Sequence, residues 1–224
     1  MNSTTPQDII ETPPSINGFT KLFAGLFSYL LHPVFIPLYV TSFLLYIHPY
    51  AFVGFSDHNR SNTLLIITLN LVFFPLLSVL LLKAVGFIDS IFLITQKDRI
   101  IPYIASGIFF FWTYTVFKEQ HSYPIILVVY IFGIFLASSF ALLANIYCKV
   151  SMHTIGMGGW LGLFLILMYT NSMLMTWPLC IVFILSGLAG TARLLAKSHN
   201  NFELYLGYVI GIASQLIAAY FLNK

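Results

Sequence analysis

Long apolar runs alternate with short polar breaks along most of this chain. A helix needs about 20 mostly apolar residues to cross the hydrocarbon core of a bilayer. Seven runs approach that length, at 34–54, 63–87, 100–117, 124–147, 155–175, 177–196 and 203–222. The pattern therefore predicts seven transmembrane helices, with six helices and one re-entrant segment as the alternative.

The N-terminal region follows a different pattern. Residues 1–17 are polar and contain several prolines, and we expect them to form a loose tail ahead of a single transmembrane domain at 18–224. The stretch from Gly18 to Leu31 is apolar but short and carries Lys21. It is expected to lie at the membrane interface, or to form a half-span that ends at His32 and Pro33.

Composition narrows the class of protein. Hydrophobic residues make up 59% of the 224 residues and charged residues only 8%, against about 25% charged in soluble domains. This excludes a soluble domain, a disordered chain and a protein with a single anchor. The runs are continuously apolar, whereas strands of an outer-membrane barrel alternate. We therefore expect an all-α, polytopic transmembrane bundle, and the net charge of +3 gives no reason to expect nucleic-acid binding.

The order of the runs predicts where the polar breaks lie. If each run crosses the membrane, the breaks at 89–102, 148–154 and 193–203 all return to the face on which His32 lies, called here the proximal face. The opposite, distal face receives 57–62, 118–123, 169–178 and the C-terminus. Because ionisable groups at membrane depth are costly and usually functional, this convergence predicts a site at the proximal face.

The third proximal cluster contains Arg193, His199 and Glu203. His199 and Glu203 are four residues apart, so they share one face if the last helix begins near His199. A carboxylate there would fix the imidazole tautomer and leave the other nitrogen free as a nucleophile or base. The alternative is an ordinary interfacial pair, with Arg193 reaching toward lipid headgroups.

The other two clusters add cations and a second histidine. Lys149, Ser151 and His153 precede or open a run, where backbone N–H groups and a hydroxyl can hold a phosphate. Lys97 and Arg99 open an earlier run. The alternatives are a helix-capping serine beside a boundary histidine, and a basic loop that sets membrane topology.

Taken together, the three clusters suit phosphoryl transfer through a histidine. Cations would hold the phosphate oxygens, one histidine would attack phosphorus and the other would protonate the leaving alkoxide. Such a scheme requires one neutral and one protonated imidazole, which predicts a bell-shaped pH dependence of kcat/KM. We expect neither a metal nor a cofactor, because the chain shows no set of metal ligands.

The same clusters resemble the three signatures of the type 2 phosphatidic acid phosphatase superfamily. Arg193, five residues, His199, three residues and Glu203 resemble Ser-Arg, five residues, His, three residues, Asp, with Ala192 and Glu203 as the differences. Ser151-Met152-His153 resembles Pro-Ser-Gly-His, with Val150 and Met152 in place of the proline and the glycine. Lys97-Asp98-Arg99-Ile-Ile-Pro102 is similar to a divergent form of Lys, six residues, Arg-Pro.

The resemblance covers about 97–203 and implies a helical catalytic core over about 88–222. It implies His199 as the nucleophile, Glu203 as its orienting carboxylate and His153 as the acid for the leaving group. It further implies that the phosphate is held by Arg99, Arg193, Ser151 and Lys97; Lys149 is added for its proximity alone.

The resulting hypothesis is a metal-independent phosphatase in the inner or plasma membrane that acts on a phosphorylated membrane lipid. Candidate substrates are phosphatidic acid, phosphatidylglycerol phosphate, a polyprenyl diphosphate and a lipid A phosphate. The alternatives are a non-catalytic transporter or binding protein for an anionic lipid, and a degenerate family member without turnover.

Two further expectations concern the side of the membrane on which the site lies and the four remaining histidines. The resemblance implies an extracytoplasmic site, although the proximal face holds most of the Lys and Arg residues, which would favour the cytoplasm. The histidines outside the three clusters are interpreted as boundary or loop residues: His32, His48, His58 and His121.

Overall fold

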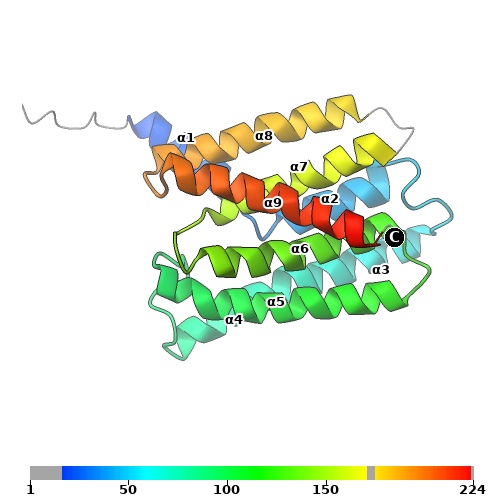
Figure 1. Ribbon diagram of the computed structural model, residues 1–224, viewed down its shortest axis with the longest axis horizontal. Helices are drawn as coiled ribbons and strands as arrows, with labels where there is room; N and C mark the ends of the chain where they lie inside the picture. Colours follow the sequence, from blue (N-terminus) through cyan, green and yellow to red (C-terminus); the bar gives the residue numbers. More distant parts are fainter. Residues whose placement is uncertain (1–16, 171–174, 223–224) are drawn as a thin grey trace, which may run out of the picture.

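The computed structural model describes residues 17–170 and 175–222 as a bundle of helices (Figure 1). Six helical segments are long and apolar enough to cross a membrane. The first is one continuous 28-residue segment, Asp57–Ala84, made of α3 (Asp57–Ile67), a π-helical stretch η2 (Thr68–Phe73) and α4 (Phe74–Ala84). The other five are α5 (Gln96–Glu119), α6 (Ile125–Ala144), α7 (Met152–Thr170), α8 (Thr176–Leu195) and α9 (Asn201–Leu222).

The first apolar run forms a shorter helix than its pattern predicts. Of residues 34–54, only α2 (Ile36–Ser42) and the π-helical η1 (Phe43–Ile47) are helical. Twelve residues at a rise of about 1.5 Å span about 18 Å, which is less than the bilayer core. The described residues thus form six long helices, and the predicted half-span at Gly18–Leu31 is a separate helix, α1 (Gly18–Leu30). The predicted N-terminal tail lies almost entirely outside the described residues.

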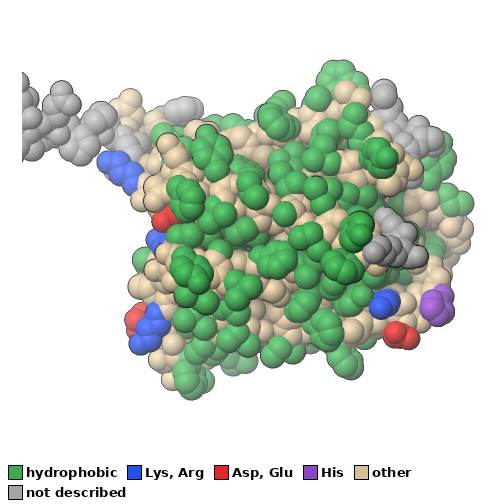
Figure 2. All heavy atoms as spheres, viewed as in Figure 1, with side chains coloured by type: hydrophobic (Ala, Val, Ile, Leu, Met, Phe, Trp, Pro, Cys, Tyr) green, Lys and Arg blue, Asp and Glu red, His purple; other side chains and the backbone are tan. Residues whose placement is uncertain are grey.

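The polar breaks gather at the two ends of the bundle, as their order predicts. The segments that join α4 to α5, α6 to α7 and α8 to α9 lie at one end, on the left of Figure 1, and the C-terminal end of α9 lies at the other. Hydrophobic side chains cover the sides of the helices in Figure 2, and most coloured charged groups lie toward the two ends. This distribution is what a bilayer requires of a helical bundle.

Glycines bring α7 and α9 into close contact. Gly158 and Gly162 of α7 face the backbones of Tyr208 and Ile212 in α9. From the other side, a Cβ at Gly211 would overlap the backbone of α7. These small residues therefore form a helix-packing interface. Because the two helices run in the same direction, this interface places the first turn of α7 beside the first turn of α9.

Candidate functional site

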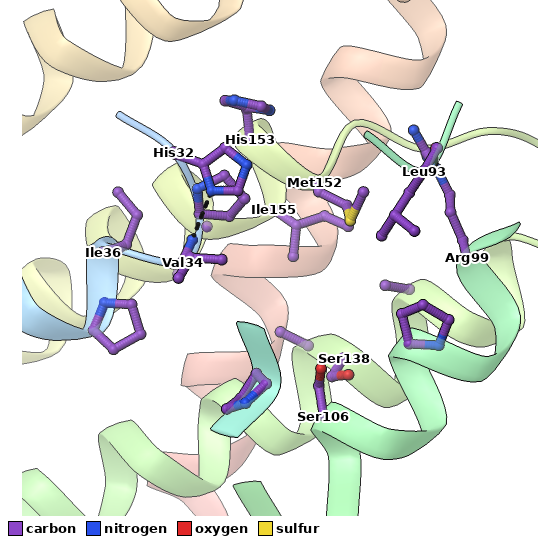
Figure 3. A pocket seen from close by; sticks show the side chains of 18 of the residues that line it. His32, Val34, Ile36, Leu93, Arg99, Ser106, Ser138, Met152, His153 and Ile155 are labelled. Atoms are coloured by element: carbon purple, nitrogen blue, oxygen red, sulfur yellow. Dashed lines mark hydrogen bonds between the residues drawn. The ribbon is translucent and has the colours of Figure 1, made fainter. Parts of the chain in front are cut away.

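A cavity of about 600 Å³ opens among the helices near the proximal end. Four of the residues predicted for the site line it: Arg99, His153, Arg193 and His199. They come from α5, α7, α8 and the α8–α9 connection, so the cavity joins segments that are far apart in the chain. In Figure 3, His153 lies on one side of this cavity and Arg99 on the other.

His199 and Glu203 form the pair that their spacing predicts. The Nδ1–H of His199 donates to Glu203 Oε2 at 2.8 Å and to the carbonyl oxygen of Lys149 at 3.1 Å. Both partners are acceptors, so Nδ1 carries the proton and a neutral ring keeps its lone pair on Nε2. The Glu203 carboxylate is itself held by the backbone N–H of Asn200, at 3.4 Å. The arrangement leaves Nε2 as the nitrogen available for chemistry.

The environment of His199 favours the neutral ring. Burial lowers the pKa of His199, and the hydrogen bond that its ring donates to Glu203 only partly offsets this effect. The nearby guanidinium of Arg99 lowers the pKa of His199 further. The ring is therefore neutral at pH 7, which is the state a nitrogen nucleophile needs.

His153 is held by a segment that carries no recognised signature. Its Nε2–H donates to the carbonyl oxygen of Ser28, in the last turn of α1, at 3.1 Å. The ring of His32 packs edge-on against the His153 ring, with 5.2 Å between the ring centroids. Both rings line the cavity and lie together in Figure 3. His32 does lie at a break between two helices, as interpreted from its sequence, and its ring also lines the cavity beside His153.

The break between α1 and α2 explains where His32 lies. The Nδ1 of His32 accepts a hydrogen bond from the backbone N–H of Val34 at 3.3 Å, so a neutral His32 carries its proton on Nε2. Burial and the positive charge of Arg193 lower the pKa of His32. No local pattern predicts this role, because the residues that act on the His32 ring, His153 and Arg193, lie more than a hundred residues further along the chain.

Arg99 is fixed at the start of α5. The Thr95 hydroxyl accepts from the backbone N–H of Asp98 at 3.1 Å, and so caps the helix. One residue later, Arg99 is 4% exposed and donates from Nε to Leu93 O at 2.9 Å and from one terminal nitrogen to Val150 O at 2.7 Å. These bonds use two of its five N–H groups.

Arg193 ends α8 and reaches into the same cavity. Its terminal nitrogens donate to the hydroxyls of Ser28, at 3.1 Å, and Ser198, at 2.6 Å. Its Nε is buried and has no hydrogen-bond partner among the described residues. Ser198 thus supplies a hydroxyl near the arginine, although Ala192 stands where the resembling signature has a serine.

Neither arginine has a carboxylate within ion-pair distance. In the described part of the chain, Glu203 makes its 2.8 Å contact with the ring of His199 and acts on Arg99 only from a greater distance. Arg99 and Arg193 therefore place two positive charges at a partly buried cavity, with neutral oxygens as their protein partners. Removing such charges from water is costly unless an anion compensates them, and the cavity is suited to an anion.

Three predicted phosphate ligands lie elsewhere. Lys97 is exposed, and neither it nor Lys149 or Ser151 lines the cavity. The backbone of Lys149 contributes the carbonyl that His199 binds. Ser151 is fully buried, and its backbone N–H donates to Glu203 O at 3.3 Å, which ties the start of α7 to α9. Their role as phosphate ligands stays a prediction.

The described residues contain no group of three or more His, Cys, Asp or Glu side chains arranged to hold a metal ion. Comparisons of this chain with protein-family models, curated proteins and solved structures find no match. The case for a function therefore depends on the geometry of the cavity and on its chemistry.

Proposed function

We propose that this chain is a membrane phosphatase that hydrolyses a phosphorylated lipid through a phosphohistidine. The observation that carries the proposal is the pairing of a buried Arg99 and a half-buried Arg193, neither within ion-pair distance of a carboxylate among the described residues, with an oriented neutral His199 at one cavity. An anion with several oxygens fits the guanidinium groups, and an imidazole lone pair beside it can attack phosphorus. The roles follow the resemblance to the type 2 phosphatidic acid phosphatase superfamily.

The reaction has two steps. In the first, Nε2 of His199 attacks phosphorus, the ester P–O bond breaks and a protonated His153 gives its proton to the leaving alkoxide. In the second, His153 takes a proton from water as the water oxygen attacks phosphorus, the P–N bond breaks and inorganic phosphate leaves. Arg99 and Arg193 would stabilise the charge on the phosphoryl oxygens in both transition states.

Phosphate release from purified protein tests this proposal. We expect turnover of at least one lipid among phosphatidic acid, phosphatidylglycerol phosphate and a polyprenyl diphosphate in mixed micelles. His199→Gln should reduce kcat by about 10³-fold or more, because it removes the nucleophile. EDTA should leave activity intact, and vanadate should inhibit it.

The matched control is His121→Gln, since His121 is exposed and lies outside the cavity lining. This variant should keep wild-type turnover. Binding of these lipids without phosphate release would contradict the phosphatase and favour a non-catalytic binding protein or transporter. Activity that is lost in EDTA and restored by a divalent ion would contradict the histidine mechanism.

A further inference from the structure

The cavity continues well beyond the charged groups. In Figure 3, Ser106 and Ser138 lie across it from His32 and His153. Apolar side chains of η2, α4, α5 and α6 line the rest of this region: Leu71, Pro75, Leu76, Val79, Phe110 and Ile134. The total of about 600 Å³ falls within the range of small-molecule sites. A single cavity therefore joins an anion-binding part to an apolar part.

A glutamine in the middle of α9 lines the same cavity. Gln215 is only 1% exposed, and its Oε1 is buried with no hydrogen-bond partner among the described residues. Its Nε2 makes one long hydrogen bond, donating to Tyr130 O at 3.4 Å. A polar atom without a partner inside a transmembrane bundle costs several kcal/mol. The amide oxygen therefore needs a hydrogen-bond donor that the described residues do not supply.

Glycines make the space that this glutamine occupies. A Cβ at Gly133 would overlap the Gln215 amide, and one at Gly162 would lie 3.0 Å from the Gln215 Cβ. Gly159 lines the cavity, and its Cβ would stand 3.8 Å from Nε2 of Gln215. The amide group is thus accommodated between α6 and α7 by residues without side chains, at the wall of the cavity.

The depth of Gln215 below the histidines follows from α7. Gly159 lies six residues after His153 in this helix, which is about 9 Å along the helix axis. A phosphate held beside His153 would therefore leave the next several bonds of its lipid at the level of the Gln215 amide. An isoprenoid or a plain acyl chain has no hydrogen-bond donor there, whereas a hydroxylated or amide-linked chain has one.

We propose that the inner part of the cavity binds one hydrocarbon chain of the lipid phosphate, and that Gln215 Oε1 accepts a hydrogen bond from a hydroxyl or amide N–H on that chain. That the charged end of this lipid is a phosphate rests on the proposed function. The proposed site for the hydrocarbon chain rests on the cavity and on the Gln215 Oε1 atom that has no hydrogen-bond partner among the described residues. A site built to bind a hydroxyl discriminates strongly against an analogue that lacks it.

Two lysophosphatidic acids that differ in one hydroxyl test this inference: one with a tetradecanoyl chain and one with a β-hydroxytetradecanoyl chain. In wild type, kcat/KM should favour the hydroxylated lipid by about tenfold or more. Gln215→Leu should bring the ratio close to one. The matched control is Gln120→Leu, because Gln120 is exposed at the end of α5 and should leave the ratio unchanged.

A binding measurement separates this inference from the proposed function. The thermal stabilisation of wild-type protein by each lipid requires no turnover, and the hydroxylated lipid should stabilise it more. If neither lipid releases phosphate but the hydroxylated lipid still stabilises the protein more, the result contradicts the phosphatase proposal and supports the hydrocarbon-chain site. Equal kcat/KM values and equal stabilisation in wild type would overturn the hydrocarbon-chain site, because Gln215 would then serve only a water molecule.

Discussion

The hydrogen bonds of His199 show how far single residues could be predicted. The pair with Glu203 was predictable because i, i+4 neighbours on a helix meet whatever the rest of the fold does. The role of Ser28, which binds both His153 and Arg193, was not predictable. Its partners lie 125 and 165 residues away, and only tertiary packing brings them together.

Replacing the carboxylate beside His199 should move the pH profile of the proposed reaction. The hydrogen bond and charge of Glu203 raise the pKa of His199 against the larger effect of burial. In wild type the acid limb of kcat/KM should therefore lie below the ordinary histidine pKa of about 6.5. Glu203→Gln removes the raising contribution, so this limb should shift to still lower pH.

The same variant should reduce the maximum of kcat/KM by about 10–10²-fold, because a neutral amide oxygen replaces the charged acceptor that orients and stabilises the ring. Rates measured from pH 4 to 9 in mixed micelles give both quantities. An acid limb that moves to higher pH in Glu203→Gln would contradict the assignment of that limb to His199.

At the scale of helices, the α7–α9 interface fixes the distance between the segments that carry His153 and His199. The Gly211 backbone packs directly against the α7 backbone near Gly158 and Gly159. Gly211→Ala should separate the helices and destabilise the protein by about 1–3 kcal/mol, as overpacking does. In detergent, this should lower the Tm by several degrees.

Gly187→Ala is the control for this prediction, because a Cβ at Gly187 has no neighbouring atom within 4 Å. Its Tm should equal or slightly exceed that of wild type, since alanine is the better helix former. A Tm that is unchanged in Gly211→Ala would mean that the two helices do not need this close approach.

The last turn of α1 contributes to the site through its backbone as well as through a side chain. Ser28→Ala removes the hydroxyl that accepts from Arg193 but keeps the carbonyl that holds His153. We therefore expect KM for the lipid phosphate to rise about 3–10-fold, with kcat within about twofold of wild type.

Ser139→Ala is the matched control, because the Ser139 hydroxyl bonds only to Phe135 O in its own helix. Steady-state kinetics of both variants on the same substrate give the KM and kcat values to be compared with those of wild type. A fall in kcat with unchanged KM in Ser28→Ala would show that this hydroxyl acts in the transition state alone.

Across the whole molecule, apolar length predicted the six long helices but overestimated the first run. Residues 48–54 are mostly apolar and therefore fall within the first predicted span. The Nδ1 of His48 accepts hydrogen bonds from the backbone N–H groups of Tyr50 and Ala51, and the polypeptide turns there. Phe52 then packs inward, with 2% of its surface exposed. Hydropathy indicates only that these side chains are buried from water. It does not distinguish a buried turn from a membrane-spanning helix.

The hydrogen bond between Ser28 and Arg193 also has a consequence for biogenesis. A ribosome makes Ser28 early and Arg193 only after 165 further residues, while His199 follows later still. Throughout that interval the first helix has none of its α8 contacts, and His153 lacks the second histidine of the cavity. A nascent chain released before α8 is inserted would thus carry an unfinished pocket, and the proposed hydrolysis could begin only once the last two helices had joined the bundle.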